Sequence, residues 1–191
     1  MTVIKNEKNL GYGGSQKKAY QYAIDKGYDL IVMLHGDAQY APERLVRLLG
    51  PLLDGEADMV FGSRMTSNPL GGRMPLWRYI GNKSLTKIEN AVLGTNLSEF
   101  HSGYRGYNCH VLKKIPFHLC SDGFLFDTDI IIQFVIKEMK IAEVDIPTHY
   151  GRESKSISAP ELVKYTSGIL SSLFHYMLHK HRIKRSRKFS I

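Results

Sequence analysis

The sequence contains only two cysteines, Cys109 and Cys120, and their spacing matches no metal-ligand pattern. A secreted domain stapled by disulfides would carry several cysteine pairs. We therefore interpret both residues as reduced thiols of a cytoplasmic protein.

Long hydrophobic runs are also missing. No segment reaches the roughly 18 apolar residues of a membrane-spanning helix, and Lys5, Glu7 and Lys8 interrupt the apolar run that a signal peptide needs. No internal repeat is visible. A length of 191 residues with 43% hydrophobic content is most economically one folded core.

The body of the chain has little excess positive charge, although the net charge is +8. A nucleic-acid-binding domain usually spreads cations and aromatic residues over one face, so we expect no nucleic-acid partner. Most of the excess lies in the tail, at Lys180, Arg182, Lys184, Arg185, Arg187 and Lys188.

The most informative stretch is the apolar run 30–34, which predicts a strand covered on both faces. The run ends in the polar residues His35, Asp37 and Gln39 before Pro42 opens a helix. Ligands of open α/β sheets bind at such strand ends, where a carboxylate can hold a divalent cation facing a diphosphate. The alternative is an ordinary strand-to-helix turn.

A glycine-rich turn at residues 9–15 leads into a predicted helix at 16–26, after a possible short strand at 2–4. Backbone N–H groups at a helix start can receive a phosphate or a nucleotide edge, which makes Gly11, Gly14 and Gln16 candidates for donor binding. This pattern is also common in plain turns.

A second polar strand end follows the apolar residues 57–61, where Arg64 offers a guanidinium suited to a diphosphate or to a surface ion pair. Before it, a helix from Leu45 is expected to close near Gly50 and Pro51. After it, a helix at 76–93 places Arg78 and Asn82 one turn apart, so that both can face one ligand.

The segment 102–105, Ser-Gly-Tyr-Arg, suggests a tight backbone turn beneath a ligand, or a purely structural turn. Further along, Asp127 either caps a helix expected at 130–139 or serves chemistry together with Asp122. The alternating pattern at 141–146 predicts an edge strand.

A polar loop follows this strand and contains a possible ligand, His149, and two cations, Arg152 and Lys155. From Pro160 the chain is predicted to be helical, with an apolar stripe that polar residues interrupt. This helix either lies at the surface of an anionic membrane or docks on the sheet with a solvated tail. We divide the chain into residues 1–158 and 159–191.

Taken together, these motifs resemble the inverting family-two glycosyltransferases of the GT-A fold, in the branch similar to dolichol-phosphate mannose synthase and other polyprenyl-phosphate glycosyltransferases. The resemblance covers about residues 3–157, and the joint order of the motifs is highly specific. The motifs are Asn-x-Gly-x-Gly from residue 9, His-x-Asp-x-Gln-x-x-Pro from residue 35, Gly-Ser-Arg at 62–64, Ser-Gly-Tyr-Arg at 102–105, Phe-Asp-Thr-Asp at 126–129 and Glu-Val-x-Ile-Pro at 143–147.

This resemblance implies an α/β fold, with a Rossmann-like mixed sheet flanked by helices and without the first strands. It implies that Asp37 coordinates Mg²⁺ or Mn²⁺ with support from Gln39. It also implies that Arg64 and Arg78 hold the donor phosphates and that Asn82 lines the same pocket. Arg152 and Lys155 lie in a loop similar to the family's acceptor loop and are implied to meet a lipid phosphate.

Two departures from the family pattern matter. His35 stands where the family commonly has an acidic residue, and imidazole suits Mn²⁺ better than Mg²⁺. Family members also begin with two strands, one ending in a Tyr-Asn-Glu type motif, that this sequence does not contain. We expect either a fragment of a longer reading frame, a partner chain that supplies the strands, or an inactive product.

The function implied is transfer of a hexose, with inversion, from a nucleotide diphosphate sugar to a polyprenyl or dolichyl phosphate or to a glycan. A lipid phosphate needs no proton removed, whereas a sugar hydroxyl needs a general base. Asp122 is the first candidate for that base, with Asp127 and Asp129 behind it. The alternative is an inactive truncated transferase that binds a partner or, peripherally, the cytoplasmic face of a membrane.

Overall fold

The computed structural model describes residues 2–36, 40–66, 68–72, 74–147 and 159–190. Four strands and six α-helices, with three short 3-10 helices, make up these residues. In chain order the elements are α1 (Gly11–Asp25), β1 (Leu30–Met33), η1 (Pro42–Arg44), α2 (Leu45–Leu53), β2 (Met59–Ser63), α3 (Leu76–Leu93), β3 (Arg105–Asn108), α4 (Cys109–Leu112), η2 (Phe117–Leu119), α5 (Phe126–Ile136), β4 (Ile141–Asp145), α6 (Ala159–Lys180) and η3 (Arg187–Phe189).

The strands form one mixed sheet in the order β1-β3-β2-β4. β2 and β4 are parallel, whereas β3 runs antiparallel to both β1 and β2. β1, β2 and β4 therefore share one direction, and their carboxyl ends lie at the same edge of the sheet. This edge is where the sequence places the polar strand ends.

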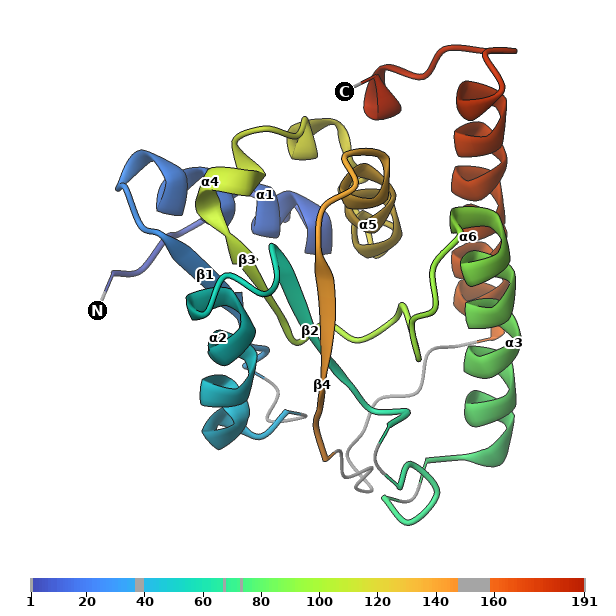
Figure 1. Cartoon of the computed structure of the whole chain (residues 1–191), viewed down its shortest axis with the longest axis horizontal. Helices are drawn as coiled ribbons and strands as arrows, with labels where there is room; N and C mark the ends of the chain where they lie inside the picture. Colours follow the sequence, from blue (N-terminus) through green and yellow to red (C-terminus); the bar gives the residue numbers. More distant parts are fainter. Residues whose placement is uncertain (1, 37–39, 67, 73, 148–158, 191) are drawn as a thin grey trace.

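Helices cover both faces of the sheet (Figure 1). On one face, Leu48 and Leu52 of α2 pack with Val60 of β2. On the other, Met59 and Phe61 join a larger core with α1, α5 and α6. This alternation follows from the two-residue period of a strand. The α/β class and the mixed sheet predicted from the sequence are confirmed.

The two long helices lie side by side at one end of the sheet (Figure 1). α3 has the predicted bounds and ends at Gly94, whose φ of 72° is a left-handed conformation that glycine adopts without strain. α6 begins where expected and packs on the core through Ile169, Leu173 and Tyr176.

The tail after α6 is mostly exposed, as the docked-helix alternative expects, but it is anchored near its end. Phe189 is fully buried in the larger core, and the Lys188 ammonium lies 2.8 Å from the Asp129 carboxylate. An aromatic residue and a paired cation therefore fasten the end of the chain to α5.

Other expectations fail at edges and ends. Residues 2–4 form no strand, and β1 is only half-buried because it lies at the edge of the sheet with β3 as its sole described neighbour. α2 continues past Pro51 to bury Leu52 instead of closing there. The predicted edge position of β4 is confirmed, whereas the central strand β3 was not predicted.

Helix starts and one strand start are also displaced. α1 begins at Gly11, five residues before the expected start, and α5 begins at Phe126 instead of 130. β2 begins at Met59. For α1 the sequence pattern marks the buried side correctly, through Tyr20 and Ala23, but not the first turn.

Candidate functional site

Arg64 follows β2 directly and is buried in an ion pair with Glu99. Its Nε lies 3.1 Å from Oε2 of Glu99, and its backbone N–H also donates to that carboxylate. Arg64 therefore forms an ion pair, as the alternative expected, but the pair is buried and does not lie at the surface. Its partner, 35 residues later in the chain, was not among the predicted site residues.

Asn82 reaches the same carboxylate from α3. Its amide nitrogen donates to Oε2 of Glu99 at 3.1 Å, and its amide oxygen accepts from the hydroxyl of Thr86 at 3.1 Å. Burial alone would raise the pKa of Glu99, but the charge and hydrogen bonds of Arg64, with the amide of Asn82, lower it below its ordinary value. Glu99 is therefore held as an anion between two residues predicted for donor binding.

Arg78 lies one turn before Asn82 on α3 and is partly exposed. Its guanidinium stacks on the ring of Trp77, 5.4 Å from the centroid. The convergence of Arg64 and Arg78 on one diphosphate stays a prediction.

Asp127 is buried at the start of α5, where Oδ2 accepts a hydrogen bond of 2.9 Å from the hydroxyl of Tyr12. Arg105 lies 3.7 Å from its other oxygen. Burial raises the pKa of Asp127, and the favourable charge of Arg105 offsets this only in part. The carboxylate does not cap α5, so that alternative is wrong: the N-cap residue is Leu125, and no side chain caps the helix.

Arg105 is fully buried and fixes the Ser-Gly-Tyr-Arg turn from within. Its guanidinium donates to the carbonyls of Phe100, Ser102 and Asp127 at 2.6, 2.7 and 3.1 Å. Burial alone would lower the pKa of Arg105, but the charge of Asp127 reverses this and raises it. The turn is therefore built around a cation that keeps its charge.

Gly103 in this turn lies directly against the end of β1. A Cβ at this position would lie 2.5 Å from Nε2 of His35 and 3.1 Å from the hydroxyl of Tyr12. Any larger residue here would therefore require the His35 ring to move. Nε2 of His35 is buried and has no hydrogen-bond partner among the residues that the structure describes.

Asp122 lies in an exposed loop, with 74% of its side chain accessible, and pairs with Lys17 at 2.8 Å. Its carbonyl accepts from the backbone N–H groups of Gly13 and Gly14 at 2.7 and 3.1 Å. The N–H of Gly11 donates to Asn9 at 2.8 Å. The amides of the three glycines in this turn thus already have partners within the chain, and a donor would have to meet the turn through other atoms.

Gln16 is buried in α1, where its amide oxygen accepts from the hydroxyl of Tyr20 at 2.6 Å. Five predicted site residues lie outside the described residues: Asp37, Gln39, His149, Arg152 and Lys155. Within the described ranges, no group of three or more His, Cys, Asp or Glu side chains could hold a metal ion. The metal site therefore stays a prediction centred on Asp37.

Sequence reasoning missed Glu99, Tyr12 and the structural role of Arg105. Glu99 could have been suspected from the sequence, because it lies in a polar segment between apolar elements. A buried guanidinium needs a carboxylate partner, and such a segment can supply one. Nothing in the sequence around Tyr12 or Arg105 indicates a contact with Asp127, because only the tertiary fold brings these residues together.

Comparison with known proteins identifies the class. Residues 1–116 match the model of glycosyl transferase family 2, and the chain belongs to this family. The low-salt glycan biosynthesis hexosyltransferase Agl6 of Haloferax volcanii is 34% identical over 156 residues, which cover 81% of this chain and 36% of that protein.

The names of two further relatives refer to a lipid phosphate. The UDP-N-acetylglucosamine–dolichyl-phosphate N-acetylglucosaminyltransferase of Methanococcus voltae is 28% identical over 80% of this chain and 61% of its own length. The polyprenol monophosphomannose synthase of Mycolicibacterium smegmatis is 28% identical over 75% of this chain and 54% of its own length. The chain thus spans between about a third and three fifths of these relatives.

The fold also matches a solved structure. Glucosyl-3-phosphoglycerate synthase from Mycobacterium tuberculosis, crystallised with Mn²⁺, UDP-glucose and phosphoglyceric acid, superimposes with a TM-score of 0.56 at 18% identity. The match covers 92% of this chain and 57% of that one. The predicted family and the GT-A fold are confirmed.

Proposed function

We propose that this chain is the core of a glycosyltransferase that transfers a hexose, with inversion, from a nucleotide diphosphate sugar to a polyprenyl or dolichyl phosphate. The observation that carries the proposal is the convergence of Arg64 and Asn82 on Glu99 beside the carboxyl end of β2. Membership of family 2 and the lipid-phosphate relatives support a transferase over an inactive binding module.

In this proposal the donor diphosphate lies across the carboxyl ends of β1 and β2. Asp37, Gln39 and His149 would hold Mg²⁺ or Mn²⁺, and a divalent cation there would supply positive charge for the leaving diphosphate. His35 supports this assignment, because its buried Nε2 lacks a hydrogen-bond partner within the described chain and imidazole suits Mn²⁺. Arg64 and Arg78 bring positive charge to the phosphates, and Glu99 fixes Arg64 in place.

The acceptor attacks the anomeric carbon from the face opposite the diphosphate. A lipid phosphate is already anionic near neutral pH, so Arg152 and Lys155 need only position it. A glycan hydroxyl would need a base, for which Asp122 is more accessible than the buried Asp127. We favour the lipid phosphate because it needs no general base.

Peripheral contact with a membrane fits α6. Val163, Leu170, Phe174 and Met177 are exposed, and their spacing places them on one side of the helix, opposite the buried Ser172. Among the described helices, none combines the length and apolar character needed to cross a bilayer. An apolar stripe followed by a cationic tail suits the surface of an anionic leaflet.

A partner strand fits β1. This strand lies at the edge of the sheet and is half-buried, so its outer edge can accept a further strand. We include in the proposal a partner chain that supplies one.

The test is transfer of radiolabelled hexose from a panel of UDP- and GDP-sugars to polyprenyl phosphate in detergent, with Mn²⁺ or Mg²⁺ present. We expect a chromatographically isolated lipid product that depends on one donor and on the metal. Calorimetric donor binding without any product would limit the chain to recognition, and neither binding nor product would contradict the proposal.

A further inference from the structure

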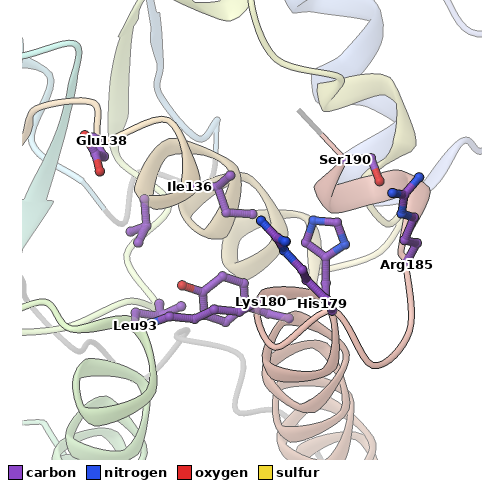
Figure 2. Close-up of a pocket in the computed structure, with 10 residues that line it drawn as sticks. Leu93, Ile136, Glu138, His179, Lys180, Arg185 and Ser190 are labelled. Carbon is purple, nitrogen blue, oxygen red and sulfur yellow. The ribbon is translucent and has the colours of Figure 1, made fainter.

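A cavity of about 960 Å³ lies where the C-terminal ends of α3, α5 and α6 meet the tail (Figure 2). β4 follows α5 directly, so this end of α5 lies near the amino end of β4. The cavity therefore lies near the amino end of β4, whereas the candidate donor site lies at the carboxyl ends of the strands. Its volume is within the range of sites for small molecules.

The cavity combines an apolar floor with a cationic rim. Leu93 and Tyr176 are buried in the floor beside the partly buried Val135 and Ile136. The rim contains His179, Lys180, Arg182 and Arg185, with Glu138 and Ser190 completing the lining.

The wall formed by the tail is fixed by specific contacts. The backbone N–H of Ser186 donates to Nδ1 of His179 at 3.2 Å, and the amide of Gln133 donates to the carbonyl of Lys188 at 3.0 Å. Together with the buried ring of Phe189, these contacts hold residues 182–190 across the cavity. The rim is thus part of the fold.

The arginine and lysine cations of the rim form no close ion pair within the described chain, although Glu138 also lines the cavity. No carboxylate there lies within ion-pair distance of Lys180, Arg182 or Arg185. The C-terminal dipole of α6 accounts for a cation in its last turn, such as Lys180, but this effect fades beyond that turn. Arg182 and Arg185 are exposed and lie past the end of the helix, so the dipole does not account for their place at the cavity.

We propose that this cavity is a second anion site, which binds a phosphate group through Arg182 and Arg185. Guanidinium groups match phosphate oxygens through paired, charge-assisted hydrogen bonds. The apolar floor suits a phosphate that carries a short apolar body, as a lipid headgroup region does. The site is separate from the transfer reaction, because it lies near the amino end of β4 and not at the carboxyl ends of the strands.

The probes are monomeric dihexanoyl phosphatidic acid and inorganic phosphate, each titrated into the full chain by calorimetry. Tighter binding of the phosphatidic acid identifies a lipid as the source of the phosphate. Equal binding of the two identifies free phosphate, and both results support the site. Absence of saturable binding for both probes would overturn it.

The decisive comparison uses two double variants with the same loss of charge. Arg182→Gln with Arg185→Gln removes two cations that line the cavity, whereas Lys184→Gln with Arg187→Gln removes two exposed tail cations that do not. We expect the first pair to weaken binding about tenfold or more and the second pair less than about twofold. Equal weakening would mean diffuse attraction to the tail and would contradict the proposal.

A further variant guards against a folding defect. Arg182 has a left-handed φ of 58°, so Arg182→Gly removes its charge while keeping a backbone conformation that glycine adopts freely. We expect Arg182→Gly to unfold at the wild-type temperature and still to bind the phosphate probes more weakly. Donor binding at the carboxyl ends of the strands should be unchanged, which separates this proposal from the proposed function.

Discussion

The carboxylate of Glu99 accepts hydrogen bonds from both the backbone and the side chain of Arg64, across 35 residues of sequence. The pair is buried at the carboxyl edge of the sheet and includes the amide of Asn82. It joins the end of β2 to α3 and to the segment before β3. The position of Arg64 therefore depends on a residue that is not expected to touch the substrate.

Glu99→Gln should destabilise the protein by about 3–5 kcal/mol, because it leaves a buried guanidinium without its counter-charge. Urea unfolding at pH 7 measures this free energy. Glu56→Gln makes the same chemical change at an exposed turn and should alter stability by less than about 0.5 kcal/mol. Equal stability of the two variants would contradict a structural role for the ion pair.

The pH dependence of unfolding should distinguish Glu99 from Asp127. The folded pKa of Glu99 is lowered, so its contribution is present above the pKa of the unfolded chain and is lost as pH falls through the folded value. The advantage of wild type over Glu99→Gln should therefore shrink on acidification.

Asp127 should behave in the opposite sense. Its folded pKa is raised, so the folded state favours the protonated acid and loses stability as pH rises above the unfolded pKa. The stability of Asp127→Asn relative to wild type should increase as pH rises above the pKa of an unfolded aspartate. Urea titrations across this range test both signs, and parallel curves for wild type and Asp127→Asn would contradict the assignment.

Gly103→Ala should displace His35 and weaken donor binding, because the new methyl group would lie 2.5 Å from Nε2 of that ring. We expect a stability loss of about 1–3 kcal/mol from this overpacking. Gly81→Ala is a matched control, since a methyl group there meets nothing within 4 Å. Restoration of stability by His35→Ala in the Gly103→Ala background would confirm the contact, and failure to restore it would locate the strain elsewhere.

Phe174→Gln should weaken binding to anionic vesicles about tenfold, since burial of a large apolar side chain contributes about 1.5–3 kcal/mol. Ser171→Gln places the same side chain at another exposed position of α6 and should have little effect. Vesicle co-sedimentation at rising salt measures both variants. Equal binding by the two variants would exclude the apolar stripe from the membrane contact.

The sequence predicted the sheet class, the bounds of α3 and the polar ends of β1 and β2, because apolar periodicity and glycine stops are local signals. It did not reveal β3 (Arg105–Asn108), which is short, carries no alternating apolar pattern and is paired on both sides. The fully buried Arg105 is unexpected for the same reason, since tertiary contacts supply its three carbonyl partners.

The candidate site was predictable only in part. Arg64 and Asn82 were identified from their places after a strand and on a helix, but their shared partner Glu99 is fixed by the fold. The tail shows the same limit: its charges predicted a solvated segment, whereas Phe189 fastens it to the core.

The central claim is that one aspartate after β1 organises metal-dependent sugar transfer, and turnover of Asp37→Ala tests it most directly. Asp54→Ala, at an exposed turn after α2, is the matched control. We predict that Asp37→Ala lowers hexose transfer to polyprenyl phosphate by about 100-fold or more while Asp54→Ala keeps the wild-type rate. Wild-type turnover by Asp37→Ala at saturating Mn²⁺ would contradict the account.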